Sequence, residues 1–182
     1  MREIRLHGIG GMGTVKAGEI IVRQTVKEGK YGASMPFFGF ERQGAPVTSF
    51  VRLDDKPIRP KNKVYYPDCV VILDPSLLVS SNVFEGFGGE AIFVLNTPHK
   101  SADTLKLNTD AAIKRIVVLD ATSIALDILG KAIPNTIMLG AFARATNWVD
   151  PDGLEQTVAE FFGKENGRAF RGGYEQALVI DI

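Results

Sequence analysis

Leu6-His7-Gly8-Ile9-Gly10-Gly11-Met12-Gly13-Thr14 is the first strong structural signal in this chain, because it carries four glycines within six positions. It follows an apolar strand that begins at Ile4. It precedes a segment from Thr14 to Lys27 whose apolar residues have helical spacing and which stops at Gly29. Glycine loses more backbone entropy on folding than any other residue, so such a cluster indicates a turn that needs it. A strand, a glycine turn and a helix together begin a βαβ unit.

The four glycines, Gly8, Gly10, Gly11 and Gly13, directly precede the start of the predicted helix. Free NH groups and the positive end of the helix dipole make such a loop suited to a phosphate or another anion. We therefore predict that the loop binds an anionic group or the backbone of a partner. The alternative is that the glycines only let the first helix pack closely on the sheet.

The spacing Gly8-x-Gly10-x-x-Gly13 also matches the dinucleotide-binding fingerprint, in the expected strand-to-helix context. That fingerprint needs an acidic residue about 20 positions further on, where it holds a ribose hydroxyl. Ala33-Ser34 occupies that region, and Glu28 comes too early. The sequence therefore argues against NAD or FAD binding. A nucleoside-triphosphate loop is excluded as well, because no Gly-Lys-Ser/Thr follows.

Strands and helices alternate along the rest of the chain. The further predicted strands span residues 30–35, 47–53, 69–73, 91–95 and 116–119. The further predicted helices span residues 77–83, 122–129, 135–146, a stretch that begins at Asp150-Pro151, and 164–178. Asp54-Asp55-Lys56-Pro57 is predicted to turn the chain back toward Ile58 in a hairpin-like connection. Residues 1–182 are therefore predicted to form a single-domain α/β sandwich around a mostly parallel sheet, with a hairpin-like addition and helices on both faces.

The charge balance argues against several classes of partner. The 182 residues include 21 Lys and Arg and 21 Asp and Glu, which gives a formal net charge of zero. Without a basic surplus, neither nucleic-acid binding nor attraction to an acidic membrane is expected. The sequence shows no signal-peptide pattern and no run of about 18 apolar residues, so we expect a cytoplasmic protein without membrane insertion.

The titratable residues form no catalytic or metal-binding pattern. The single cysteine, Cys69, lies in an apolar strand and is expected to be a small core residue; one thiol cannot hold an iron–sulfur cluster, which needs about four. His7 and His99 have neither metal-ligand spacing nor a Ser-His-Asp order. Asp74 and Asp120 follow strands, at the edge where α/β sheets bind ligands, and helix capping is the simpler interpretation. We therefore expect no catalytic residue and no metal in this chain.

A second unusual stretch runs from Phe37 to Val47 and combines three phenylalanines with Glu41-Arg42 and Gly44. Exposed phenylalanine rings are unfavourable, so these rings are expected to be buried or covered by a partner. Charges beside buried rings are usually paired or directed at a ligand. We therefore predict a functional or interface loop here rather than a solvated charge pair.

Both stretches resemble the gamma subunit of 2-oxoacid:ferredoxin oxidoreductases. Gly8-Ile9-Gly10-Gly11-Met12-Gly13 is similar to that family's Gly-Arg-Gly-Gly-Gln-Gly loop, and residues 36–47 are similar to its Phe-Gly-x-Glu-Arg-Arg-Gly-Ala-Pro-Val stretch. Further similar segments are Pro57-Ile58-Arg59, Asp74-Pro75, Asn96-Thr97, Asp120-Ala121-Thr122 and residues 135–146. The resemblance covers nearly the whole chain, and the form Pro-Phe-Phe-Gly-x-Glu-Arg is similar to gamma subunits of the pyruvate synthase type.

The resemblance implies an oxidoreductase subunit that is not catalytic alone. Enzymes of this family act on the oxo group of a 2-oxoacid such as pyruvate. They form acyl-CoA and CO2 from that acid and coenzyme A, and they pass electrons to ferredoxin or another acceptor. The resemblance places thiamine diphosphate on alpha and beta subunits and iron–sulfur clusters on beta and a ferredoxin-like delta subunit. The gamma chain alone would hold no cofactor in this heteromeric complex of anaerobic metabolism.

The resemblance also gives both stretches a role in forming the coenzyme A region. The residues implied in that role are Gly8, Gly10, Gly11, Gly13, Glu41, Arg42 and Gly44. Ile9, Met12 and Gln43 stand where the family has Arg, Gln and Arg, so backbone NH groups are the contacts that would remain. The alternative function is a free-standing nucleotide- or dinucleotide-binding α/β protein.

Overall fold

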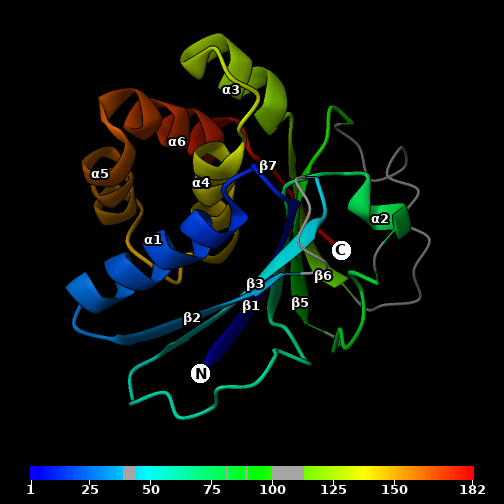
Figure 1. Cartoon of the computed structure of the whole chain (residues 1–182), viewed down its shortest axis with the longest axis vertical. Helices are drawn as coiled ribbons and strands as arrows, with labels where there is room; N and C mark the ends of the chain where they lie inside the picture. Colours follow the sequence, from blue (N-terminus) through cyan, green and yellow to red (C-terminus); the bar gives the residue numbers. More distant parts are fainter. Residues whose placement is uncertain (39–43, 81, 89, 100–112) are drawn as a thin grey trace.

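A seven-stranded sheet forms the centre of the chain within the residues that the computed structural model describes, which are 1–38, 44–80, 82–88, 90–99 and 113–182 (Figure 1). The strands follow the spatial order β2-β3-β1-β4-β5-β6-β7. Their bounds are β1 (Arg2–Ile9), β2 (Tyr31–Phe38), β3 (Pro46–Asp54), β4 (Cys69–Ile72), β5 (Ala91–Asn96), β6 (Ile113–Leu119) and β7 (Leu178–Asp181).

The sheet has a parallel centre and antiparallel edges. β1 pairs in parallel with β4, β4 with β5, and β5 with β6. β3 is antiparallel to β1 and to β2, and β7 is antiparallel to β6. The chain thus forms the mostly parallel α/β sheet that the alternating pattern predicts.

The hairpin in this sheet differs from the predicted one. β2 and β3 pair along their whole lengths, from Tyr31 opposite Asp54 to Phe38 opposite Val47. The turn after Asp54 does not lead to a paired strand, and Ile58 lies in an irregular segment. The prediction around Ile58 was wrong because the alternating pattern of β3 finds its partner earlier in the chain, across the aromatic stretch.

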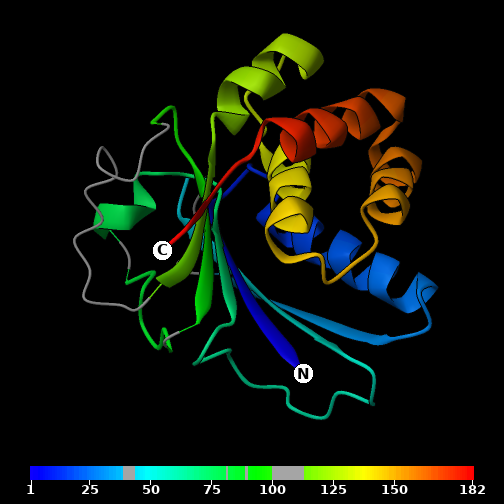
Figure 2. The same ribbon diagram turned by 180° about the vertical axis from the view of Figure 1, so that it is seen from behind.

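Six helices pack around the sheet in the described residues. They are α1 (Thr14–Lys27), α2 (Leu77–Ser80), α3 (Ala121–Leu129), α4 (Asn135–Thr146), α5 (Pro151–Phe162) and α6 (Lys164–Gln176). The five longer helices form a layer over one face, while the four-residue α2 lies on the other, as the two opposite views show (Figures 1 and 2). Helices therefore lie on both faces, as predicted, but very unequally.

Side-chain alternation along β1 divides the core between the two faces. Ile4 and Leu6 are buried in a large cluster with α1 and α4, whereas Arg5 and His7 point to the opposite face because successive strand residues alternate. All four residues of β4 are fully buried, with Cys69 among them. The continuous apolar run in the sequence thus reflects a central strand that is covered on both faces.

The long helices pack closely because two glycines sit at the contact of α4 with α6. An added Cβ would lie 2.1 Å from the carbonyl oxygen of Phe170 at Gly140, and 2.1 Å from that of Ile137 at Gly173. Any side chain at either position would push the two helices apart. Within the segment predicted as the last helix, Gly173 is therefore required by packing.

Three aspartates accept hydrogen bonds from backbone NH groups just after them in the chain. Asp120 accepts a hydrogen bond from the NH of Ser123 at 3.0 Å and caps α3. Asp150 accepts one from the NH of Gly153 at 2.7 Å and caps α5. Asp74 accepts one from the NH of Ser76 at 2.8 Å. The capping interpretation is confirmed for Asp120, whereas the side chain of Asp74 binds an NH that precedes the first residue of α2, Leu77.

None of the helices in the described part of the chain combines the length and the apolar character that a membrane span requires.

Candidate functional site

The glycine loop connects β1 to α1 at the carboxyl end of the parallel strands. The NH of Gly10 donates to the carbonyl of Ala45 at 2.9 Å, and the NH of Met12 donates to that of Ile9 at 3.1 Å. Within the described part of the chain, the NH groups of Gly11 and Gly13 donate to no protein acceptor. Two backbone hydrogen bonds therefore fix the loop, and two of its NH groups have no acceptor among the described residues.

Packing explains two of these glycines. An added Cβ on Gly8 would lie 2.1 Å from Oγ1 of Thr14, and one on Gly13 would lie 2.3 Å from Nδ2 of Asn135. Gly8 and Gly13 are thus needed so that α1 and α4 can approach the end of β1. Close helix packing, the alternative interpretation of this loop, is therefore correct for these two positions.

Packing does not explain Gly11. Its φ is 98°, a value that side chains rarely adopt, and an added Cβ would meet no atom within 4 Å. The position is therefore open on the side where a side chain would project. Gly11 thus has an NH without an acceptor among the described residues, beside open space and just before the start of α1. Loops that bind anions at helix N-termini have this local geometry.

A shallow cavity of about 320 Å³ lies at this loop. Its lining combines glycine backbone with apolar side chains from three elements, namely Ile9, Gly10, Gly11, Gly13, Thr14, Val15, Lys16 and Val47. Among the described residues of this lining, Lys16 alone is charged, and its ammonium pairs with Glu19 at 2.8 Å. The cavity thus offers backbone donors and an apolar wall rather than a set of charged ligands.

The structure brings five of the seven predicted contact residues to one edge of the sheet. Gly8, Gly10, Gly11 and Gly13 belong to the loop itself. Gly44, with φ of 89°, directly precedes Ala45, whose carbonyl binds the NH of Gly10. Glu41 and Arg42 lie outside the described residues, so their predicted role stays a prediction.

His7 adjoins the loop in sequence, but its side chain belongs to the opposite face of the sheet. Nδ1 lies 3.4 Å from the hydroxyl of Thr48, and the residue is 9% exposed. Burial and, second, the charge of Arg5 lower the pKa of His7 to about 3. The imidazole is therefore neutral near neutral pH and supplies no positive charge to the glycine loop.

Other titratable residues are committed to structure. Burial, reinforced by the charge of Asp68, raises the pKa of the Cys69 thiol far above its ordinary value, and the residue has no exposed surface. Within the described residues, no three His, Cys, Asp or Glu side chains gather as a metal site would require. Among the described residues, the glycine loop therefore has neither a metal-binding cluster nor an accessible thiol beside it.

Two buried asparagines organise this edge of the sheet, and sequence reasoning assigned a role to neither. Asn96 donates from Nδ2 to the carbonyl of Leu73 at 2.8 Å and accepts from the NH of Ala121 at 2.9 Å, so it ties three strand ends together. Asn135 packs against Gly13 and accepts from the NH of Thr136 at 2.9 Å. An asparagine directly after a buried strand, or at a helix start, is the signal that could have identified them.

Comparisons with known proteins agree along the whole length. The family model described as pyruvate ferredoxin/flavodoxin oxidoreductase matches residues 3–176. The "pyruvate/ketoisovalerate oxidoreductases common subunit gamma" of Pyrococcus furiosus is 45% identical over 186 residues, which cover 100% of both chains. The "pyruvate synthase subunit PorC" of Methanothermobacter thermautotrophicus is 44% identical, covering 100% of this chain and 99% of its own. The crystal structure of the pyruvate oxidoreductase subunit PORC from Thermotoga maritima superposes with a TM-score of 0.87 at 34% identity, covering 99% of this chain and 98% of that one.

Proposed function

The chain belongs to the pyruvate ferredoxin/flavodoxin oxidoreductase family, and from this premise we propose that it is the gamma subunit of an assembly that oxidises a 2-oxoacid such as pyruvate. The assembly would form acyl-CoA and CO2 from the 2-oxoacid and coenzyme A and pass the electrons to ferredoxin or another acceptor. The observation that carries the proposal is similarity over the full length of chains that are themselves gamma-type subunits. A free-standing nucleotide-binding protein is not favoured, because these relatives are subunits.

We propose that the chemistry takes place on partner subunits. The described residues contain no nucleophile with an adjacent base: Cys69 is buried and Asp120 caps a helix. In the proposed assembly, thiamine diphosphate on alpha and beta subunits supplies the decarboxylation chemistry. Iron–sulfur clusters on beta and a ferredoxin-like delta subunit carry the electrons. The gamma chain then contributes binding surface, and a cytoplasmic location stays a prediction.

We further propose that the glycine loop contacts a phosphate group of coenzyme A through its backbone. The unpartnered NH groups of Gly11 and Gly13, in front of α1, suit a phosphate in geometry and in charge. Ile9 and Met12 bring no polar group to this loop, so recognition would depend on NH donors. Glu41 and Arg42 are proposed to complete the contact from the neighbouring stretch.

The choice of 2-oxoacid is proposed to lie outside this chain. The Pyrococcus furiosus relative is, by its name, a subunit common to pyruvate and ketoisovalerate oxidoreductases. A subunit shared by two such enzymes does not distinguish their substrates. The same division of roles would leave this chain with the part of the reaction that all these enzymes share, which is the use of coenzyme A.

The test compares two glycines in the assembled enzyme. Gly11 and Gly29 both have positive φ, 98° and 78°, and neither has an atom within 4 Å of an added Cβ. Gly11→Ala and Gly29→Ala therefore impose similar local strain, one in the loop and one beyond the far end of α1. We expect Gly11→Ala to raise KM for coenzyme A by about tenfold with kcat little changed, and Gly29→Ala to leave both unchanged.

Equal coenzyme A kinetics in the two variants would show that the loop does not contact coenzyme A. Arg42→Ala provides a second measurement in the same assay, and it should raise KM for coenzyme A if the neighbouring stretch takes part. Failure of the chain to join any thiamine-dependent assembly would contradict the proposed function as a whole.

A further inference from the structure

A second cavity, of about 290 Å³, lies on the sheet face that the long helices leave uncovered. Arg5 and His7 of β1 line it from the sheet, and Lys63 and Tyr65 line it from the segment that follows β3. The remaining lining residues are Phe37, Thr48, Phe50, Val64, Asn82 and Glu85. This cavity does not include the glycine loop, whose residues line the cavity described above.

Arg5 is a nearly buried cation that forms no ion pair among the described residues, although the charge of Glu85 lies close enough to act on its pKa. The residue is 6% exposed, and its Nη2 donates to the carbonyls of Val83 at 3.1 Å and Glu85 at 2.5 Å. Its Nε has no hydrogen-bond partner, and no salt bridge involves this side chain in the described part of the structure. Buried charges in proteins are normally paired, and among the described residues this one has two carbonyl acceptors and the nearby charge of Glu85 but no ion pair.

Two further polar groups of the same cavity also lack a hydrogen-bond or ion-pair partner among the described residues. Nε2 of His7 is buried and has no hydrogen-bond partner among the residues that the structure describes. The ammonium of Lys63 lies 3.8 Å from the centre of the Phe37 ring and pairs with no carboxylate among the described residues. Glu85 lines the cavity as well, but it meets Arg5 through its backbone carbonyl, and no ion pair forms between the two side chains. The lining therefore carries one more positive than negative group.

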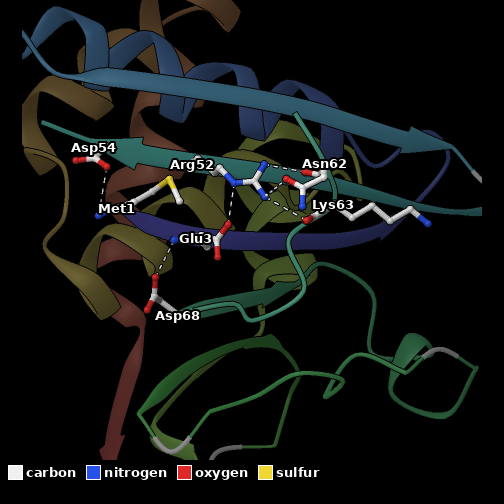
Figure 3. Close-up of polar contacts among 7 residues, drawn as sticks. All are labelled: Met1, Glu3, Arg52, Asp54, Asn62, Lys63 and Asp68. Carbon is white, nitrogen blue, oxygen red and sulfur yellow. Dashed lines mark hydrogen bonds and ion pairs between the residues drawn. The ribbon is translucent and has the colours of Figure 1, made fainter. Parts of the chain in front are cut away.

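The position of Lys63 is fixed by the fold. Arg52 donates from Nη2 to the carbonyl of Lys63 at 3.1 Å and from Nη1 to the carbonyl of Asn62 at 2.7 Å, and its Nε pairs with Glu3 at 2.7 Å. Figure 3 shows the Lys63 side chain extending along the sheet, away from this network. A buried arginine thus anchors the backbone from which the free ammonium projects.

Exposed aromatic rings surround the cavity. Phe37 is 44% exposed, Tyr65 is 57% exposed, and the adjacent Tyr66 is 76% exposed. Aromatic residues are enriched at the centres of protein interfaces, where they supply contact area at low entropic cost. These exposed rings favour a protein partner over a free cofactor as the occupant.

We propose that this cavity receives an aspartate or glutamate side chain from a partner subunit, which pairs with Lys63 above the buried Arg5 while the aromatic rings pack around it. The inference rests on the proposed function, since it requires partner subunits. Charge complementarity is its main argument, because the two cations share one nearby carboxylate, that of Glu85, and an incoming carboxylate would supply the counter-ion that Lys63 lacks. The site would determine which subunit docks on this face of the sheet.

The test uses carbodiimide cross-linking of the intact assembly, purified without oxygen. The reagent activates a carboxyl group, which forms an amide with an amine that contacts it, so only touching pairs are joined. We expect mass spectrometry to find an amide between Nζ of Lys63 and an Asp or Glu of a partner subunit. Lys63→Arg, which keeps the charge without the reactive amine, should assemble normally and lose this cross-link.

A charge reversal supplies the second measurement, with a matched control in the same segment. Lys63→Glu should weaken subunit association by about tenfold or more, whereas Lys61→Glu, also exposed, should have little effect. The proposed carboxylate contact would be overturned if Lys63→Glu assembled normally and the complex of the wild-type chain gave no cross-link. The proposed function would still stand in that case. A cross-link from Lys63 only to a carboxylate of its own chain, or saturation of the isolated chain by acetate at millimolar concentration, would also overturn the proposed contact. Absence of any assembly with the unmodified chain would instead contradict the proposed function.

Discussion

His7 should make the stability of this chain depend on pH in the mildly acidic range. Burial and, second, the charge of Arg5 lower the pKa of His7 from 6.5 to about 3 in the folded chain. Below pH 6.5 the unfolded chain takes up a proton that the folded chain does not bind. Because the unfolded state binds more protons in this window, the free energy of unfolding is fully retained above pH 6.5 and falls as the pH drops toward 3.

The magnitude follows from the width of the window. Each pH unit inside it removes about 1.4 kcal/mol of unfolding free energy, so the total loss between pH 6.5 and pH 3 approaches about 5 kcal/mol. Small domains unfold with a total of about 5–15 kcal/mol. One imidazole on β1 therefore accounts for a large share of the acid sensitivity that we expect.

Urea unfolding at pH 7, 6, 5 and 4 measures this effect in the wild-type chain and in His7→Gln. The wild-type free energy of unfolding should fall more steeply than that of the variant, by about 1.4 kcal/mol per pH unit between pH 6 and 4. Carboxyl groups titrate in both proteins and cancel in the difference. His99→Gln is the control and should keep the wild-type slope, because its His7 is intact. Equal slopes for wild type and His7→Gln would refute the argument that the folded chain holds a neutral, buried imidazole.

Three further predictions concern stability. Gly173→Ala should destabilise the chain by about 1–3 kcal/mol in a thermal melt, because its Cβ would lie 2.1 Å from a carbonyl oxygen of α4. Gly172→Ala is the control: its Cβ would lie 3.5 Å from the nearest atom, so this variant should be neutral or stabilising in the same melt. Arg52→Met should lower the free energy of unfolding in urea by about 3 kcal/mol, because it removes a buried ion pair and the hydrogen bonds drawn in Figure 3. Its control, Arg168→Met, breaks an exposed ion pair and should lower the free energy of unfolding by less than about 1 kcal/mol. Asp120→Ala should cost about 1 kcal/mol by removing the cap of α3, measured in the same way.

Different results would contradict each of these predictions. Similar melting temperatures for the two glycine variants would mean that α4 and α6 can separate without cost. A loss at Arg52→Met no larger than at Arg168→Met would mean that the buried network adds little to stability. An unchanged Asp120→Ala variant would show that α3 does not depend on its cap.

The local signals in the sequence predicted most of the fold. α1 begins at Thr14 and ends at Lys27, as its apolar spacing and the glycine stop indicate, and α4 has the predicted bounds Asn135–Thr146. The errors came from pairings that no local pattern records. The sequence alone did not indicate that β3 pairs with β2 instead of turning back toward Ile58, or that residues 178–181 add an edge strand.

The candidate site could be predicted only in part, for a related reason. The glycines stood out because such a cluster is unusual for any chain, but only the structure separates Gly8 and Gly13, which packing requires, from Gly11, which faces open space. The cavity at Arg5 was missed because its residues come from separate elements. Two polar residues at alternate positions of an apolar strand, Arg5 and His7, were the available signal.

The central claim is that this chain works as the gamma subunit of a 2-oxoacid oxidoreductase assembly. The most direct measurement is an affinity purification of the tagged chain from its own cells without oxygen, with the recovered partners identified by mass spectrometry. We expect recovery of thiamine diphosphate-binding and iron–sulfur chains, in an assembly that reduces ferredoxin when given a 2-oxoacid and coenzyme A. Recovery of the chain alone, as a monomer or a homo-oligomer that binds a nucleotide tightly, would contradict the central claim.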